Sequence, residues 1–290
     1  MSTFHPHVAI IMRSYNDADV IRQTLEMVKR QTYRNVTLWN FDSTSSDGTL
    51  DIIREFNRPE RIFLNSSADY NPGRVLNEAV AIASADVFVF LNSDATPLGT
   101  DWLEQLIEPL ADASVGATFG RQTPRPGCYS LFVKDTERAF GDGSVAAGWT
   151  HFYSMANAAV RADIMAQYPF ETRINYSEDI EWSYRIRRDQ HDIVYVAEAA
   201  ATHSHNYTLK QSYRRHRGEG MAEAWIFRCG EINTSFLRYF LLPFGREVLR
   251  DISWGIRRHS IAALAHSLPL RAVQKWGRWQ GMRETLKNET

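Results

Sequence analysis

Cysteines and long apolar runs are both scarce in this sequence of 290 residues. Cys128 and Cys229 are too far apart and too few for a disulfide framework or a four-cysteine zinc site, which fits a reducing compartment. The start, MSTFHPHVAI, has no basic segment followed by a long apolar one, and no run of about 18 uncharged apolar residues follows anywhere. We expect a folded cytoplasmic protein without a standard export signal or a membrane span.

An excess of charge of one sign is also lacking, because 33 Lys and Arg residues nearly balance 34 Asp and Glu residues. This balance argues against a general attraction to nucleic acid. The charges are unevenly distributed, however. Residues 1–120 carry 9 basic and 16 acidic side chains, whereas residues 207–290 carry 15 and 7. We therefore expect a basic surface on the C-terminal part.

Short apolar runs alternate with stretches of helical spacing along the first two thirds of the chain. Strands are predicted at His7–Met12, Val36–Phe41, Arg61–Leu64, Val87–Leu91, Val115–Phe119 and Ile193–Val196. Helices are predicted after Asp17 and at Thr49–Phe56, Arg74–Ala83, Trp102–Leu110 and Ile180–Arg188. Residues 120–148, with seven glycines and prolines, are predicted to be loop. This alternation predicts an α/β fold with a mostly parallel sheet, whose ligands lie at the C-terminal strand ends.

Polar side chains follow three of the predicted strands at that edge. Asp94 ends the segment Asn92-Ser93-Asp94 directly after the run VFVFL, where a carboxylate can meet a divalent ion. A lone Asp at this point would usually only form a turn. Asp42 and Ser14 lie in loops after two other strands, so we expect three polar loops to converge on one crevice.

Two further groups of chemically capable residues occur late in the chain. Glu178 and Asp179 open a predicted helix, where acids are common simply because they complement the helix dipole. His203 and His205 follow the last predicted strand, and in a strand-like segment they would point to the same side. A lone histidine is usually structural, but two beside an incomplete carboxylate motif favour a metal site.

Five segments, in this order, resemble glycosyltransferase family 2: IIMRSYN, WNFDSTSSDGT, FLNSDATP, YSEDIEWSYR and HSH. The resemblance covers about residues 7–215. It implies a GT-A fold and transfer of a sugar from a nucleotide diphosphate donor with inversion at the anomeric carbon. We accordingly predict a catalytic domain at 1–220, with a nucleotide-binding half (1–100) and an acceptor-binding half (101–220). A helical, basic extension at 221–290 follows.

The resemblance also implies roles for individual residues. Ser14, Tyr15 and Asn16 would lie beside the nucleotide, with Tyr15 able to stack on the base. The second-strand motif departs from the family pattern, because Ser43 stands where a second acid is usual, so that Asp42 or the Ser43 hydroxyl is left to contact the base. The predicted donor-binding set is Ser14, Tyr15, Asn16, Asp42, Ser43, Arg74, Asn92, Ser93, Asp94 and Arg214.

The family's Asp-x-Asp metal motif is reduced here to Asn92-Ser93-Asp94. By resemblance Asp94 would bind Mn²⁺ or Mg²⁺, with His203, and less readily His205, completing the ligand set. Asp179 would be the catalytic base, and Glu178 would orient the acceptor or Asp179. Arg74 and Arg214 would hold phosphates, although a solvated basic face explains Arg214 equally well.

YSEDIEWSYRI with HSHNYTLKQ is most similar to rhamnosyltransferases within the family. This similarity implies a dTDP-rhamnose donor, or else a UDP-sugar. A glycan or lipid-linked acceptor in bacterial surface polysaccharide synthesis is expected. One alternative is a sugar-nucleotide pyrophosphorylase, although IIMRSYNDAD lacks the glycine-rich loop of that class. The other is a binding protein on a degenerate GT-A core.

The C-terminal segment mixes arginines with apolar residues at helical spacing. Val248, Ile252 and Ile256 recur every four residues, while Arg250 and Arg257 lie elsewhere around the helix. One interpretation is an in-plane helix on the inner face of the plasma membrane. The other is a helix packed on its own catalytic domain or on a second subunit in a homodimer.

Overall fold

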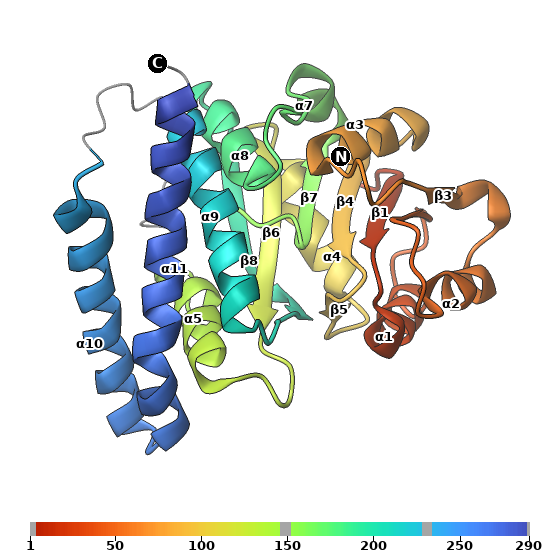
Figure 1. Cartoon of the computed structure of the whole chain (residues 1–290). Helices are drawn as coiled ribbons and strands as arrows, with labels where there is room; N and C mark the ends of the chain where they lie inside the picture. The colour runs from red at the N-terminus through yellow and green to blue at the C-terminus, as the bar shows by residue number, and fades with distance from the viewer. Residues whose placement is uncertain (1–3, 146–151, 228–233, 289–290) are drawn as a thin grey trace. The chain divides into compact units, whose positions relative to one another are not determined.

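A computed structural model describes residues 4–145, 152–227 and 234–288, and it confirms the α/β class (Figure 1). Its strands form one sheet in the order β3-β2-β1-β4-β7-β6-β8-β5. Their bounds are β1 (Val8–Ser14), β2 (Val36–Asp42), β3 (Ile62–Leu64), β4 (Val87–Asn92), β5 (Thr96–Pro97), β6 (Val115–Thr123), β7 (Asn157–Arg161) and β8 (Asp192–Thr202).

The helices of the structure confirm most of the predicted helices. They are α1 (Ala18–Lys29), α2 (Thr49–Phe56), α3 (Pro72–Ile82), α4 (Trp102–Ile107), α5 (Ser130–Phe140), α7 (Ala162–Gln167), α8 (Glu178–Arg188), α9 (Leu209–Ile226), α10 (Leu242–Arg257) and α11 (Ile261–Asn288). Short 3₁₀ turns at Pro59–Arg61 and Glu108–Ala111 and a π-helical turn at Leu237–Leu241 complete the set that the structure describes.

The chain divides into two compact units. The first comprises residues 1–125, 136–173 and 178–204 and holds the sheet; the second comprises residues 126–135, 174–177 and 205–290. The helical C-terminal extension is confirmed by α10 and α11. The predicted border between residues 220 and 221, which falls inside α9, stays a prediction.

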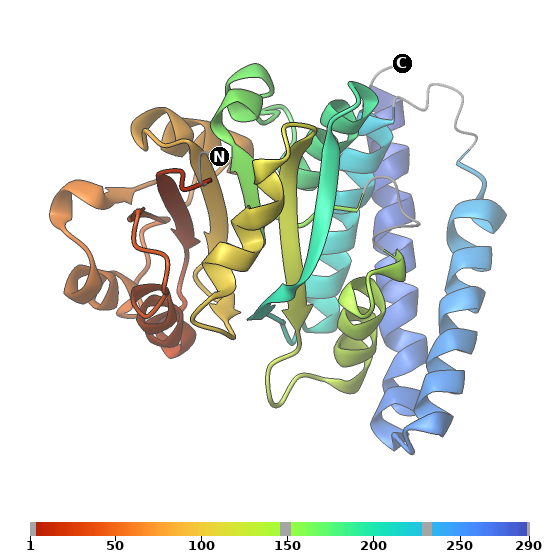
Figure 2. The same cartoon turned by 180° about the vertical axis from the view of Figure 1, so that it is seen from behind.

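Strand β1 lies at the centre of the parallel part of the sheet. It pairs in parallel with β2 and with β4, so that Ser14 aligns with Asp42, and Arg13 with Asn92. Its alternate side chains enter different cores, because Ile10 packs among residues of α1, α2 and α4 while Ile11 packs among residues of α3 and α8. Burial on both faces explains the continuous apolar run of β1. Figure 2 shows the sheet from behind, with α4 of the first unit in front of the strands.

The prediction of loop over residues 120–148 was partly wrong: residues 124–129 are irregular, but two regular elements occupy other parts of this range. β6 continues to Thr123, and α5 occupies Ser130–Phe140. The prolines and glycines flank α5 rather than interrupting it, and buried side chains stabilise it: Leu131 packs with Ala263 and Leu270, and Phe140 with Phe152. Residues 146–148 lie outside the described residues.

Three more elements were not predicted: β5, β7 and α7. β7 (NAAVR) is rich in alanine, which has little strand propensity, and it forms because β4 and β6 pair with it on both sides. α7 follows it directly. β8 continues to Thr202, beyond the predicted Ile193–Val196, and His203 and His205 follow it, as predicted.

The second unit is held together by close helix packing and by a buried cluster of charges. A side chain at Gly281 would place its Cβ 2.0 Å from the carbonyl oxygen of Arg217, so α9 and α11 approach backbone to backbone. Asp251 is fully buried and accepts hydrogen bonds from Lys134, Ser267 and Arg271. Within the described residues, no helix has the length and hydropathy that a membrane span requires.

Candidate active site

The loops after β1 and β2 are joined through the carboxylate of Asp42. The Ser14 hydroxyl donates to Asp42 at 2.7 Å, and the Ser45 backbone N–H and hydroxyl both donate to it at 2.7 Å. Asp42 is fully buried and Ser43 is 6% exposed. Asp42 therefore shapes the two loops, and its contact with a nucleotide base stays a prediction.

Further hydrogen bonds fix the same pair of loops. The Asn16 backbone N–H donates to the Ser45 hydroxyl at 2.9 Å, and the Asn16 side chain accepts from the backbone N–H of Ser46 at 2.9 Å. Asp47 accepts from the backbone and hydroxyl of Thr49, the first residue of α2. Asp47 therefore holds the turn that leads into α2. Tyr15 is 55% exposed beside these loops, as a residue that stacks on a ligand would be.

Arg13, at the end of β1, connects two of the predicted motifs. Its Nη1 donates to Glu178 at 3.3 Å and its Nη2 donates to the Asn92 side chain at 3.3 Å. Asn92 begins the metal motif and Glu178 precedes the predicted base, Asp179. One guanidinium thus brings together segments that are 86 positions apart along the chain, since residues 92 and 178 both contact it.

The charge on Arg13 is strongly favoured. Burial alone would lower its pKa, but the neighbouring Tyr70, Glu178 and Asp179 raise the pKa above its ordinary value. The Arg13 and Glu178 side chains are only 17% and 13% exposed, so solvent screens their ion pair less than it would a surface pair. Arg13 is therefore a permanent cation at this edge of the sheet.

Asp94 and His203 lie close to each other at the same edge. His203 Nε2 is 3.4 Å from Asp94 Oδ1, and each side chain is 13% exposed. The possible ligand atoms of Asp94, His203 and His205 all lie within 4.8 Å of one another. These are the three metal ligands predicted from the sequence.

A second contact sets the tautomer of His203. Its Nδ1 lies 2.7 Å from the Gln122 side-chain oxygen, which can only accept, so Nδ1 carries a proton. In the neutral ring Nε2 then presents its lone pair toward Asp94. Gln122 is held in turn, because its amide nitrogen donates to the Ser154 hydroxyl at 2.8 Å. Outer partners of this kind commonly orient histidines that bind metals.

The donor set fits a divalent ion. Two ligands bound at about 2.1 Å with an angle of roughly 90–110° are separated by roughly 3.0–3.4 Å. The Asp94–His203 separation of 3.4 Å lies in this interval. One carboxylate oxygen and one imidazole suit Mn²⁺ or Mg²⁺ when phosphate oxygens supply further ligands.

Asp179 lies in the first turn of α8, and its Oδ1 accepts a hydrogen bond from the backbone N–H of Ile180 at 2.8 Å. It is close enough to the buried hydroxyl of Tyr153 that burial and the Asp179 charge together raise the Tyr153 pKa well above its ordinary value. Tyr153 therefore remains a neutral phenol beside Asp179. The Asp179 carboxylate thus lies near enough to both the Arg13 guanidinium and this phenol to influence their charge states.

The remaining predicted residues are distributed as follows. Ser93 is 1% exposed and its hydroxyl donates to Asp17, so Ser93 helps to hold the loop between β1 and α1 in place. Arg74 is exposed on α3, where its guanidinium donates to the backbone oxygen of Asp69. Arg214 is exposed on α9, in the second compact unit. Phosphate binding by either arginine stays a prediction.

The family model described as Glycosyl transferase family 2 matches residues 9–168, which is more than half of the chain. The chain belongs to glycosyl transferase family 2. It is therefore a glycosyltransferase with the GT-A fold, as the order of its motifs indicated, and the pyrophosphorylase interpretation is set aside.

Curated relatives from O-antigen synthesis resemble most of the chain. O-antigen chain rhamnosyltransferase RfbN of Salmonella typhimurium is 28% identical over 235 residues, which are 76% of this chain and 74% of the relative. O-antigen chain rhamnosyltransferase WbaN of Salmonella anatum is 29% identical over 241 residues, covering 77% and 75%. The rhamnosyltransferase-like character of the chain is thereby supported.

Solved structures confirm the fold. The mannosyltransferase PcManGT from Pyrobaculum calidifontis, in complex with GDP-Man and Mn²⁺, has a TM-score of 0.66 and 19% identity, and the match covers 99% of this chain and 89% of that one. Glucosyl-3-phosphoglycerate synthase from Mycobacterium tuberculosis, in complex with Mn²⁺ and uridine diphosphate, has a TM-score of 0.54 and 17% identity, covering 77% and 80%.

Several side chains of the candidate active site were not predicted from the sequence. Arg13, Tyr70 and Tyr153 were missed because their partners are distant in sequence. Arg125 donates to the backbone oxygen of Asp94, and Gln122 orients His203. The only available signal was position: Arg13 opens the first polar loop, and Gln122 lies in a strand that leads to the same edge.

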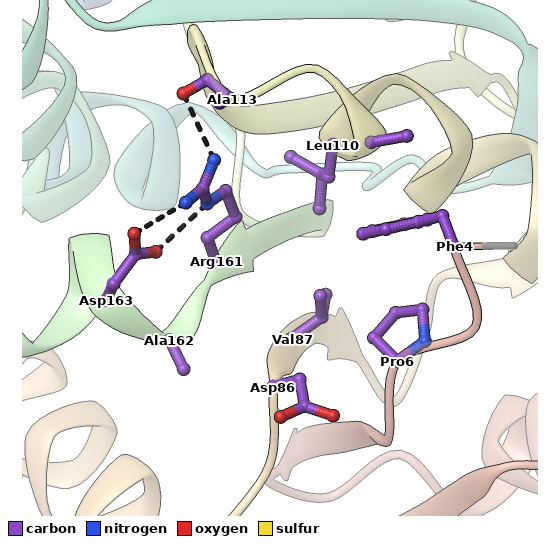
Figure 3. Close-up of a pocket in the computed structure, with 10 residues that line it drawn as sticks. Phe4, Pro6, Asp86, Val87, Leu110, Ala113, Arg161, Ala162 and Asp163 are labelled. Carbon is purple, nitrogen blue, oxygen red and sulfur yellow. Dashed lines mark hydrogen bonds and ion pairs between the residues drawn. The ribbon is translucent and has the colours of Figure 1, made fainter. Parts of the chain in front are cut away.

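A hollow of about 470 Å³ lies at the opposite edge of the sheet, near the beginnings of β1 and β4 (Figure 3). Pro6 and Val87 line it, and its one guanidinium, Arg161, is held by Asp163 and by the backbone oxygen of Ala113. No predicted site residue lines this hollow. It is therefore separate from the candidate active site.

Proposed function

We propose that the chain is a divalent-metal-dependent, inverting glycosyltransferase. It transfers a sugar from a nucleotide diphosphate donor to a hydroxyl of a glycan or lipid-linked acceptor in surface polysaccharide synthesis. The observation that carries the proposal is the Arg13 guanidinium, which contacts both the metal motif at Asn92 and the acid pair at Glu178. A cation-binding group and a candidate base are thereby gathered at one strand edge.

Asp179 is the proposed base. A hydroxyl is a weak nucleophile until its proton is being removed, so a carboxylate within hydrogen-bond reach lets the acceptor oxygen attack the anomeric carbon. The new carbon–oxygen bond forms as the bond to the diphosphate breaks, and the proton passes to Asp179. Attack from the face opposite the leaving group inverts the anomeric carbon.

Glu178 is proposed to position rather than to react. Its carboxylate is already engaged by Arg13 at 3.3 Å. This ion pair fixes the first turn of α8 and with it the direction of the Asp179 side chain. A role in orienting Asp179 or the acceptor follows from this engagement.

Asp94 and His203, with His205 as a third candidate, would hold the metal ion. A bound divalent cation supplies positive charge to the departing diphosphate, which gains negative charge at the transition state. Gln122 keeps the His203 lone pair available for this purpose. Asn92 offers at most a neutral oxygen, and here its oxygen accepts from Arg13.

The loops after β1 and β2, which hydrogen bonds to Asp42 connect, are proposed to bind the nucleotide. Ser14, Asn16, Ser43 and Asp42 shape the surface on which the base lies, and Tyr15 stacks on it. Arg74 and Arg214 are proposed phosphate contacts. dTDP-rhamnose is the first donor candidate because the curated relatives are rhamnosyltransferases, and a UDP-sugar is the second.

Thermal stabilisation by nucleotide sugars tests the proposal. Purified protein is heated with dTDP-rhamnose, UDP-glucose or GDP-mannose, each with Mn²⁺ or with EDTA. We expect one donor to raise the melting temperature with Mn²⁺ and not with EDTA, since a ligand at 100 times its Kd adds about 2.7 kcal/mol. Release of the nucleoside diphosphate from that donor then measures turnover.

Two outcomes would contradict the proposal. Donor binding with Mn²⁺ but without any turnover, even with added glycan acceptors, would indicate a binding protein on a degenerate catalytic core. Turnover that is equal in Mn²⁺ and EDTA would remove the metal from the mechanism.

A further inference from the structure

The outer face of α10 exposes apolar side chains at helical spacing. Leu242, Leu249, Ile252 and Ile256 are 62%, 69%, 39% and 61% exposed, and they follow one another by seven, three and four residues. This spacing places them in one stripe along the helix. Ile261, which begins α11, is 82% exposed. A contiguous apolar stripe on an exposed helix usually marks an interaction surface.

Arginines lie beside this stripe. Arg246 and Arg257 are exposed on α10. Arg246 is four residues after Leu242, and Arg257 directly follows Ile256. We call the stripe together with these two arginines the apolar–arginine face. The same helix has two acids, Glu247 and Asp251, and both are buried on its other side, where they contact Lys134. Positive charge is thus outside and negative charge inside.

No acid is exposed in the described segment from residue 236 to residue 268, whereas five arginines occur in it. Exposed aromatic rings lie near the start of α10: Phe236 is 42% exposed, and Trp276 of α11, 6.5 Å from it between ring centroids, is 38% exposed. Aromatic rings with one exposed side are typical of surfaces that meet lipid headgroups.

We propose that the apolar–arginine face binds the surface of an anionic lipid bilayer, with α10 lying in the plane of the membrane. The leucines and isoleucines would enter the headgroup boundary, and Arg246 and Arg257 would face the lipid phosphates. This role does not depend on the proposed function. It does suit an enzyme whose acceptor is lipid-linked.

Charge favours a bilayer over a second copy of the chain. Two copies that met face to face by this surface would bring their exposed arginines together, and no exposed acid of the same segment would neutralise them. An anionic membrane instead offers opposite charge to every arginine and an apolar layer to the stripe. The face is therefore assigned to lipid.

Flotation with vesicles tests this role directly. The full chain is mixed with vesicles of phosphatidylcholine alone, or of phosphatidylcholine with phosphatidylglycerol, at low and at high salt. We expect binding to the anionic vesicles that weakens as salt rises, and little binding to phosphatidylcholine alone.

Two variants separate the contributions. Leu249→Gln with Ile252→Gln and Ile256→Gln removes the stripe, and Arg246→Glu with Arg257→Glu reverses the charges. Each should weaken vesicle binding at least about tenfold, because the first removes the side chains that enter the headgroup boundary and the second replaces attraction to the lipid phosphates by repulsion. All five positions avoid the buried face of α10, so the fold should persist.

Matched controls lie on the first unit. Ile82→Gln on α3 removes an apolar side chain that is 42% exposed, and Arg34→Glu reverses an exposed charge. Both should bind vesicles like the unchanged protein. Donor turnover in solution should also stay unchanged in the α10 variants, which shows that they are folded.

Three outcomes would overturn the inference. The first is equal binding to neutral and anionic vesicles, and the second is full vesicle binding by both α10 variants. The third is a dimer in lipid-free solution, seen by light scattering, that the stripe variant converts to a monomer while vesicle binding is absent. That last result would assign the face to a second copy.

Discussion

Arg13 donates to Glu178 across 3.3 Å although 165 positions separate the two residues. The contact ties the end of β1 to the beginning of α8. It positions the acid pair of α8 relative to the metal motif, whose first residue, Asn92, accepts from the same guanidinium at 3.3 Å. A single side chain therefore connects the two segments to which the proposed metal site and the proposed base belong.

A double-mutant cycle measures this contact. Arg13→Met and Glu178→Gln should each lower kcat by about tenfold to a hundredfold, and the double variant should be little worse than either, because contacting residues couple by about 0.5–3 kcal/mol. The exposed Arg22–Glu55 pair, with side chains 45% and 55% exposed, is the control, and Arg22→Met should leave kcat unchanged. Strict additivity of the two site variants would show that the contact has no role in turnover.

Asp179→Asn should abolish transfer and retain the donor. Loss of a general base commonly costs about 10²–10⁴ in rate, and kcat should fall without a change in donor Kd. Asp19→Asn is the matched control, since Asp19 is also an acid in the first turn of a helix. If the two variants lost the same modest amount of activity and stability, Asp179 would only complement its helix dipole.

Removal of the metal ligands, or of the outer partner Gln122, should weaken Mn²⁺ binding. Asp94→Asn and His203→Gln should each shift the Mn²⁺ titration by more than about tenfold, and Gln122→Leu should shift it by about 10–100-fold through the orientation of His203. Enhancement of water proton relaxation by bound Mn²⁺ provides a readout independent of turnover. His191→Gln, whose ring packs against Tyr168, is the control. Unchanged titrations in the Asp94 and His203 variants would leave them as a simple ion pair.

Asp251→Asn should destabilise the second unit. Burial alone would raise the pKa of Asp251, but hydrogen bonds from Arg271 and Lys134 lower it, so it is ionised at neutral pH. Removing its charge leaves two buried cations with less compensation, at an expected cost of about 3–5 kcal/mol in the free energy of unfolding. Asp51→Asn, in an exposed pair with Arg54, should cost less than about 1 kcal/mol. Urea unfolding compares the two variants, and equal costs would contradict the assigned role.

Lys275→Met should stabilise the protein at neutral pH and lose that advantage in alkali. Burial, with help from Arg278, lowers the pKa of Lys275 from 10.5 to about 8 in the folded state. Below pH 8 the Lys275 amine is charged in both the folded and the unfolded state, so the cost of burying that charge lowers the free energy of unfolding in full. Between about pH 8 and 10.5 the unfolded state binds more protons, so the stability of the unchanged protein rises with pH.

The gain from Lys275→Met, at most about 3 kcal/mol, should therefore be constant below pH 8 and vanish near pH 10.5. The difference in unfolding free energy between variant and unchanged protein measures it, because other titrating groups cancel. A gain that did not change with pH would trace the effect to packing.

Local patterns were sufficient to predict the parallel half of the fold. β1 and β4 are buried on both faces, and continuous apolar runs are what such strands require. The place of Asp94 in the fold was predictable because Asp94 closely follows the buried strand β4. Patterns failed at β7, whose strand conformation is imposed by two neighbours rather than by its own alanines.

The sequence indicated which types of residue belong to the candidate site, but not which of their side chains contact one another. His203, Asp94 and Glu178 were recognisable, whereas the contacts of Arg13 and Gln122 join positions 165 and 81 apart. Such pairs leave no periodic trace in a single sequence. Asp42 shows the same limit: its position at the end of β2 was predictable, but the three donors that surround it and bury it were not.

The network around Asp42 has a consequence for the speed and thermodynamics of substrate capture. Because Ser14 and Ser45 already immobilise their loops, an incoming nucleotide has little chain entropy to remove. The nucleotide should then bind with little rearrangement of the protein and should associate fast. The heat-capacity change of binding should be no larger than expected from the surface area that the nucleotide itself buries. Asp42→Ala would loosen both loops and make recognition a coupled ordering event.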